Sequence, residues 1–178
     1  MSWKIVIVGV ILIVLSFALT YYTQTLVQKY IVESTVHGPE MILLGKDVGP
    51  FKLNFTLDSR GQFAVVIGAN ASLFNYLDVK LLSKGVSLVP TGNYTDKESG
   101  VLIKNYEITA PGLYTVLLTS DIAPPINVNL TCLFLSESIL SGIESIRIMN
   151  FASTAFLFSG IAVAIVGLFK GIRGLRKR

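Results

Sequence analysis

Few residues in this sequence have the types and the spacing that catalysis requires. His37 is the only histidine and Cys132 is the only cysteine. One histidine excludes a metal site built from several histidines, and a Ser-His-Asp triad would depend on that single ring. His37 precedes Gly38-Pro39, which is typical of a turn, so we expect a solvated histidine rather than a general base. These residues predict that the protein is not an enzyme and has no catalytic residue.

Acidic residues in loops are the remaining candidates for chemistry. Asp96, Glu98 and Asp121 could present oxygen atoms to a cation, but we favour ordinary solvated turns at these positions. The sequence contains no CxxC, HExxH, Walker or Gly-rich dinucleotide motif. We therefore expect neither a metal site nor a cofactor.

The sequence contains four N-glycosylation sequons, which predict that its middle segment is exported. Cys132 has no cysteine partner in the chain, so the exported part must be held together by core packing rather than by a disulfide. Sequons without disulfides favour an archaeal cell envelope over an animal cell surface. The predicted glycosylation sites are Asn54, Asn70, Asn93 and Asn129.

Two stretches are long and apolar enough to cross a lipid bilayer. The first lies between Lys4 and Lys29 and holds 24 uncharged residues; the second lies between Arg147 and Lys170 and holds 22. As helices they reach roughly 33–36 Å, which exceeds a hydrocarbon core of about 30 Å. Only 15% of the chain is charged and the mean hydropathy is +0.64, values typical of a membrane protein.

Each stretch has an alternative interpretation. The first could be a cleaved signal peptide, since Ser16-Phe17-Ala18 fits a small-x-small cleavage site. Tyr21-Tyr22 favour a retained helix, because aromatic residues gather at membrane interfaces. The second could be a core helix, which the basic cluster after it disfavours.

Charge is divided unevenly along the chain. The ends carry six of the 15 Lys and Arg residues, whereas all 11 Asp and Glu residues lie between them. Under the positive-inside rule, we expect both termini in the cytoplasm and the central domain outside the plasma membrane. Topology and contact with membrane lipid then explain the basic ends, and we predict no nucleic-acid partner. The basic residues at the ends are Lys4, Lys170, Arg173, Arg176, Lys177 and Arg178.

The middle of the chain has the period-two pattern of β-strands. Apolar residues from Leu53 to Leu57 alternate with polar ones, which places Asn54 on a solvated face. The stretch from Ile126 to Phe134 alternates in the same way. That register exposes Asn129 and buries Cys132, so we expect the thiol to fill the core rather than to act as a nucleophile. Further strand candidates are residues 41–44, 63–69, 77–82, 86–89, 102–108 and 113–119.

About eight short strands with no helical pattern between them indicate an all-β antiparallel sandwich that is jelly-roll-like. The predicted fold class is a membrane protein with this sandwich between two transmembrane α-helices. Residues 1–28 would form the cytoplasmic N-terminus and first transmembrane helix, and residues 29–136 the sandwich. Residues 137–172 would form a stalk helix that continues into the second transmembrane helix, and residues 173–178 a basic cytoplasmic tail.

Two segments of the predicted sandwich carry a family resemblance. Leu77-Asp-Val-Lys-Leu-Leu82 and, after a variable loop, Ala110-Pro-Gly-Leu-Tyr-Thr-Val-Leu-Leu118 resemble the hairpin-rich end of GOLD-type and bacterial pre-peptidase-type β-sandwiches. GOLD-domain cargo receptors are similar to this chain in having a C-terminal transmembrane helix after the sandwich. They typically have a cysteine pair, which this chain lacks. The resemblance implies the architecture and no functional residues.

The predicted helices offer surfaces for contacts. A helix from about Ser138 would carry Ile139, Ile143 and Ile146 at helical spacing, and we expect these three to form a contact surface near the membrane. The first helix could extend through Ile31, although residues 29–36 also have the pattern of a strand. Small residues allow close packing, either of the two spans or in a homo-oligomer. They are Gly9, Ser16, Gly160, Ala164, Gly167 and Gly171.

These features favour a structural or interaction protein. It would be an accessory subunit of a membrane complex or a surface protein of the cell envelope, with protein partners or a second copy bound through the stalk and the spans. The alternative is a ligand-binding or sensory domain outside the membrane. Co-purification in mild detergent would separate the two, because an accessory subunit brings stoichiometric partners.

Overall fold

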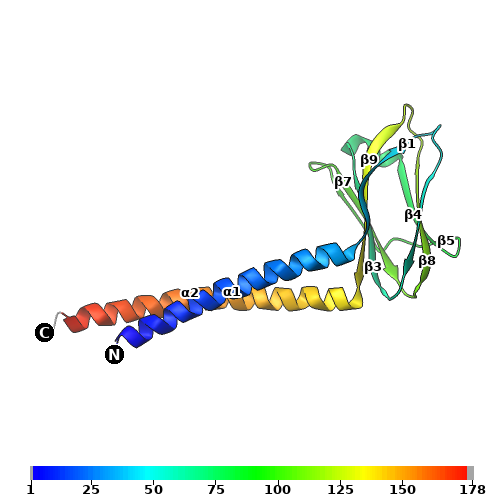
Figure 1. The fold of residues 1–178 in the computed structure, drawn as a ribbon. Coiled ribbons are helices and arrows are strands. Elements are labelled where there is room, and N and C mark those ends of the chain that lie inside the picture. The colour runs from blue at the N-terminus through cyan, green and yellow to red at the C-terminus, as the bar shows by residue number, and fades with distance from the viewer. Residues whose placement is uncertain (1, 176–178) are drawn as a thin grey trace. The chain divides into compact units, whose positions relative to one another are not determined.

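The computed structural model describes residues 2–175, with side chains placed for residues 3–170. Contacts divide the chain into a helical unit, which ends at Ile31 and resumes at Ser141, and a β unit, Val32–Leu140. Figure 1 shows the helices of the first unit and the sandwich of the second.

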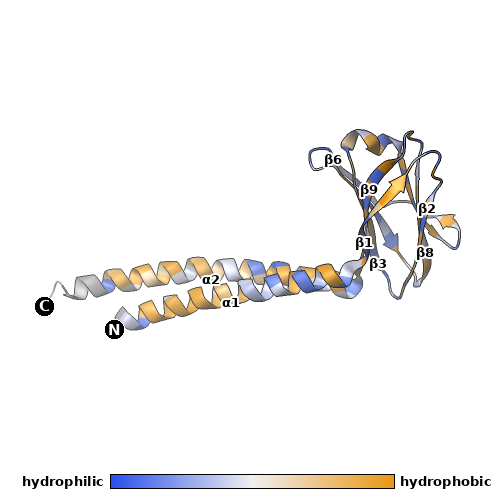
Figure 2. Cartoon of the chain, turned by 45° about the horizontal axis from the view of Figure 1, so that its top comes forward, coloured by the Kyte–Doolittle hydropathy of each residue, from blue (hydrophilic) through white to orange (hydrophobic). Residues whose placement is uncertain are grey.

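Two long helices form the helical unit. α1 spans Ser2–Ser34 and α2 spans Glu137–Leu175. By length and composition, both helices could cross a membrane. Figure 2 shows that apolar residues concentrate in the N-terminal half of α1 and in the C-terminal half of α2. The sequence left both a helix and a strand possible for residues 29–34, and in the structure these residues belong to α1.

The start of α2 follows from its capping residue. The hydroxyl of Ser136 accepts a hydrogen bond from the backbone N–H of Ile139 at 3.3 Å. This satisfies one of the N–H groups that a helix leaves without an internal partner. Glu137 lies in the first turn, where a negative charge interacts favourably with the helix dipole.

The β unit is an antiparallel sandwich of two sheets. Sheet A has five strands in the order β1-β9-β3-β7-β6, and sheet B has four in the order β2-β8-β4-β5. Without β6, the two sets of four strands have the order of a jelly roll, and β6 extends one edge of sheet A. The bounds are β1 Thr35–Leu44, β2 Phe51–Leu57, β3 Gly61–Gly68, β4 Leu77–Ser83, β5 Val86–Ser87, β6 Gly92–Asp96, β7 Val101–Ile108, β8 Gly112–Ser120 and β9 Ile126–Ser136.

The core lies between the two sheets. Residues that face inward from both sheets form one cluster, which includes Phe63, Tyr106 and Val116. The ring of Phe55 in sheet B stacks on that of Phe63 in sheet A, with ring centroids 4.7 Å apart. Such a pair stabilises the contact between sheets beyond the apolar area that it buries.

Two elements differ from the expectation of about eight strands with only turns between them. Residues 92–96 form an additional strand, β6, which was not among the strand candidates. Its ladder with β7, from Gly92–Asn105 to Asp96–Val101, provides backbone hydrogen bonds that a local pattern does not reveal. A short 3-10 helix, η1 (Ala71–Tyr76), is capped by Asn70.

Candidate functional site

The two candidate residues for chemistry are neighbours in the β1–β9 ladder of sheet A. His37 is paired in register with Cys132, in a part of β1 that contains two register shifts. The expected turn at His37 is therefore wrong, because a bulged strand incorporates Gly38-Pro39. His37 Nε2 lies 2.7 Å from Glu40 Oε2.

Cys132 is fully buried, as its alternation in the sequence predicted. Burial raises the pKa of its thiol from 9.0 to about 12. A thiol that stays protonated and has no access to solvent is a poor nucleophile. Cys132 is therefore part of the core.

Asp96, one of the three acidic candidates, stabilises a local turn. Asp96 Oδ1 accepts hydrogen bonds from the backbone N–H groups of Glu98 at 3.0 Å and Ser99 at 3.3 Å. Hydrogen bonds from the side chain and backbone of Ser99, and from the backbone of Glu98, lower the pKa of Asp96. Among the residues that the structure describes, no three His, Cys, Asp or Glu side chains lie close enough to hold a metal ion.

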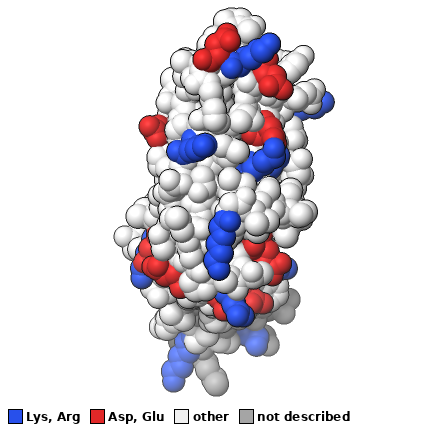
Figure 3. All heavy atoms as spheres, turned by 90° about the vertical axis from the view of Figure 1, so that its right-hand side faces the viewer, with Lys and Arg blue, Asp and Glu red and all other residues white. Residues whose placement is uncertain are grey.

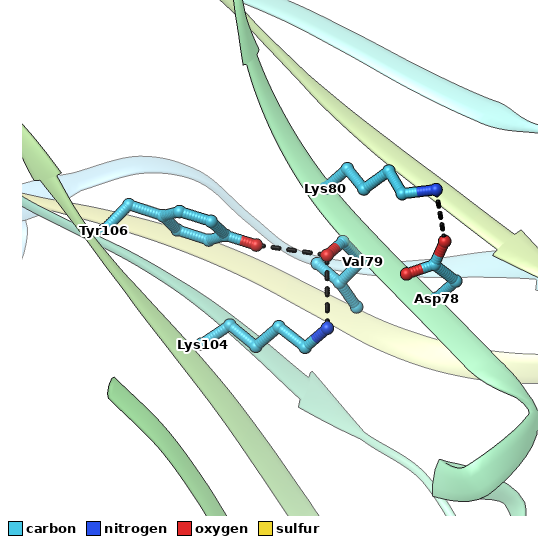
Figure 4. Close-up of polar contacts among 5 residues, drawn as sticks. All are labelled: Asp78, Val79, Lys80, Lys104 and Tyr106. Carbon is cyan, nitrogen blue, oxygen red and sulfur yellow. Dashed lines mark hydrogen bonds and ion pairs between the residues drawn. The ribbon is translucent and has the colours of Figure 1, made fainter. Parts of the chain in front are cut away.

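A buried polar contact ties the two sheets together. The Val79 carbonyl on β4 accepts hydrogen bonds from Tyr106 Oη at 3.1 Å and Lys104 Nζ at 3.2 Å, both on β7 (Figure 4). β5 pairs with β4 only at Leu82 and Ser83, so this carbonyl has no strand partner on its free side. The pKa of Tyr106 rises from 10.0 to about 12, chiefly through burial and secondarily through the charge of Asp78. The contact is structural.

Two of the open grooves of ligand size in the β unit are lined more by polar than by apolar surface. One, of about 480 Å³, has Arg60, Glu107 and Glu137 in its wall. The other, of about 440 Å³, is bordered by β6, β7 and η1 and includes Asn93, Lys97 and Lys104. Both volumes fall within the range of small-molecule sites, which are usually more apolar.

All four sequon asparagines are exposed. Asn54 lies on β2, at an edge of sheet B, and Asn93 lies on β6, at an edge of sheet A. Asn129 lies on β9, which is flanked by β1 and β3, and Asn70 caps η1. Asn54 Oδ1 accepts a hydrogen bond from Thr115 Oγ1 at 2.7 Å.

The outer faces of the two sheets differ in polarity. On sheet B, Lys52 and Lys80 flank Leu117, and Asp78 lies 2.7 Å from Lys80. Figure 3 shows charged groups of both signs scattered over the face of the molecule that it presents. On sheet A, the ladders bring five uncharged residues together across neighbouring strands. This outer patch consists of Ala64, Val66, Tyr94, Ile103 and Leu133, and the same two rows also contain the polar residues Asn105 and Thr131.

The outer patch is unusual for a solvated sheet, because an antiparallel strand that faces water normally alternates polar with apolar residues. Residues Phe63–Ile67 of β3 are instead apolar without interruption, with Val65 inward and Val66 outward. Tyr94 at the edge of the patch is 58% exposed. Large exposed apolar patches are common at interaction sites, and this face is uncharged and partly exposed.

The structure brings most of the small helix residues together between α1 and α2. A Cβ atom added to Gly9 would lie 2.7 Å from the Gly160 carbonyl oxygen and 2.6 Å from the Ala164 backbone nitrogen. One added to Gly167 would lie 2.8 Å from a methyl group of Val6. The backbones therefore approach closely because these residues have little or no side chain. The side-chain surroundings of Gly171 lie outside the described residues.

A row of polar side chains continues the same helix contact, and only Ser16 among them was predicted. Ser153 Oγ donates to the Ser16 carbonyl at 2.9 Å and lies 2.8 Å from Thr20 Oγ1. Thr23 donates to Asn150 Oδ1 at 2.9 Å. Ser16, Thr20 and Thr23 recur every three or four residues, and this spacing was the signal for a polar helix face.

The three stalk isoleucines are not equally accessible. Ile139 and Ile146 are 8% and 7% exposed, whereas Ile143 is 42% exposed. Two of the three therefore pack within the chain and offer little apolar area to a partner. This differs from the expectation that all three would form a contact surface.

Comparison with known proteins found no family model that matches the chain and no similar curated protein. A proposal about function must therefore rest on the fold and on the surfaces described above.

Proposed function

We propose that this protein is a membrane-anchored interaction protein, with α1 and α2 crossing the plasma membrane as a hairpin. The jelly roll lies outside the cell and binds a protein partner through the outer patch of sheet A. In this role the chain is a non-enzymatic accessory subunit of a membrane complex or a structural protein of the cell envelope.

The outer patch is the observation that carries the proposal. An antiparallel sheet normally has polar residues on a face that stays in water, as sheet B does. Charged residues are depleted at the centre of protein interfaces, and the patch combines four aliphatic side chains with one tyrosine. The sequence predicts an interaction surface on the stalk. Because Ile139 and Ile146 are buried, we propose the outer patch of the sandwich instead.

The helix pair supports the membrane anchor. Its apolar segments are long enough to cross a bilayer, and its polar side chains are paired with each other across the contact. Unpaired polar groups are costly in hydrocarbon, and hydroxyl groups and asparagine that bond across helices remove that cost. The basic residues near both ends favour a cytoplasmic location for both termini.

The test exchanges one central residue on each outer face. Val66→Glu puts a charge in the patch, and Leu117→Glu puts the same charge between two lysines on sheet B. On purification in mild detergent from the native host, Val66→Glu should lose a stoichiometric partner that wild type and Leu117→Glu retain. Burial of Cys132 from a maleimide confirms that both variants are folded. Retention of the partner by Val66→Glu would refute the patch as the binding surface.

The alternative of a ligand-binding or sensory domain is favoured by the groove of about 480 Å³. Its wall combines Arg60 with two carboxylates, Glu107 and Glu137, so it would suit a small polar molecule carrying charge. In that case the protein would purify without a partner, and Glu107→Gln rather than Val66→Glu would impair function.

A further inference from the structure

A sandwich of two sheets has four edge strands. In this protein the four edge strands are not all protected in the same way. An unpaired edge strand displays backbone N–H and C=O groups that can pair with a strand from another molecule. Here the edge strands are β1 and β6 in sheet A, and β2 and β5 in sheet B. Each of these four edge strands must therefore be protected from pairing with another chain.

Two of the edges are protected by the backbone itself. β1 contains Pro39 and two register shifts against β9, and both features prevent a continuous ladder with a new strand. β5 is only two residues long, Val86–Ser87, and Pro90 follows three residues later. Short strands, bulges, prolines and charged side chains, lysine above all, are the usual means of protecting an edge.

The other two edges lack bulges and prolines, although Lys52 gives β2 one charged side chain near its start. β2 pairs with β8 over all seven of its residues with no register shift, and β6 pairs with β7 over all five of its residues in the same way. Neither strand contains a proline. Each is an edge with an uninterrupted register that could accept another strand.

β2 and β6 are also the two edge strands that contain an N-glycosylation sequon. Asn54 lies at the centre of β2 and Asn93 near the start of β6, and both side chains are exposed. The other two sequons lie elsewhere: β9, which carries Asn129, has a neighbour on each side, and Asn70 caps η1.

We infer that glycans on Asn54 and Asn93 protect the edges of β2 and β6 against strand addition. A strand added to β2 would lie about 4.8 Å away, with its side chains about 4.5–5.5 Å from those of β2. The Oδ1 atom of Asn54 is turned toward Thr115 on β8, so a bulky, hydrated sugar chain on Nδ2 would hinder a strand from entering that space. The same holds for Asn93 on β6. This inference rests on the outward location of the sandwich given under Proposed function, since export exposes the sequons to glycosylation.

The test compares two variants that each lose two sequons, produced as the full chain in a host that glycosylates exported proteins. The edge variant is Asn54→Gln/Asn93→Gln. The control is Ser72→Ala/Asn129→Gln, in which Asn70 still caps η1. Intact mass counts the glycans, light scattering after size exclusion in detergent gives the oligomeric state, and amide hydrogen exchange locates new backbone pairing.

The edge variant should form dimers and larger species as concentration rises, whereas wild type and the control keep the same oligomeric state. In those species, the amides of β2 and β6 should exchange more slowly than in wild type. Equal association of both variants would overturn the inference, since general shielding would then suffice. An edge variant that stays like wild type would also overturn it.

A wild-type chain without glycans would overturn the inference as well. In that case, a separate experiment tests the proposed topology: tags at the two ends are exposed to external protease. Tags resistant to external protease leave the proposed function standing, and digested tags refute it.

Discussion

The shared Val79 carbonyl leads to a prediction about how the two sheets are held together. Tyr106 and Lys104 both donate to this one oxygen, at 3.1 and 3.2 Å. Removing either donor leaves the carbonyl with the other one. Removing both leaves a buried acceptor without a side-chain donor, which costs more than a lost hydrogen bond.

The perturbation is a double-mutant cycle with Tyr106→Phe and Lys104→Met, which keep most of the apolar part of each side chain. Each single variant should lower the free energy of unfolding by about 0.5–1.5 kcal/mol. The double variant should lose about 1 kcal/mol more than the sum of the two, a coupling within the usual range for residues that share a partner. Lys80→Met is the control. It breaks an exposed ion pair with Asp78, and such pairs contribute about 0–1 kcal/mol.

Cys132 provides the assay. It is the only thiol and is fully buried in the sandwich, so a maleimide reaches it only when the β unit opens. In the full chain in detergent, the labelling rate relative to that of the unfolded chain reports the free energy of opening. A coupling of about 1 kcal/mol would appear as about a fivefold excess in labelling. If the single effects simply add to within about 0.5 kcal/mol, the two donors do not share a desolvated carbonyl.

Three further predictions concern pH, helix packing and topology. The folded-state pKa values of Cys132 and Tyr106 are both raised to about 12, so their contribution to stability is complete below about pH 9 and is lost as pH rises toward 12. Thermal melts should show this loss, and Cys132→Val should reduce it. Gly9→Leu should destabilise the helix pair by about 1–3 kcal/mol through overpacking, measured as a lower melting temperature than that of Val10→Leu; equal values would contradict the close helix contact. Tags at both ends should resist external protease on intact cells, and digestion of either tag would refute the cytoplasmic location of that end.

Much of the sandwich could be predicted because its strands have one face in the core and one in water. Asp78 and Lys80 on β4, for example, alternate with the buried Leu77, Val79 and Leu81, and the structure confirms that register. The same physical pattern correctly placed Cys132 in the core. Where alternation is strong, burial determines the register, since a shift by one residue would put every side chain on the wrong face.

The prediction was weaker where contacts distant in sequence decide the structure. β6 has no buried side chain of its own, and its pairing with β7 makes it a strand. The burial of Ile146 depends on how its helix packs, whereas helical spacing only indicates that it shares a face with Ile139 and Ile143. The polar helix contact shows the same limit, because Asn150 and Ser153 have their α1 partners more than a hundred residues away.

If sheet A binds a partner as proposed, a glycan at the sequon on β9 would limit how that partner reaches the outer patch. Asn129 is paired with Met41 and Gly68, one row from the row that contains Val66 and Ile103. Successive rows on one face of a sheet are about 7 Å apart. A glycan on Asn129 would therefore border the patch on one side and leave Ala64 and Leu133, a further row away, more accessible. A partner should then contact the rows of Ala64 and Val66 most closely, so Ala64→Glu should weaken binding, whereas Asn129→Gln should leave it unchanged or strengthen it. Loss of the partner on Asn129→Gln, with the fold intact, would instead show that the glycan itself is part of the binding surface.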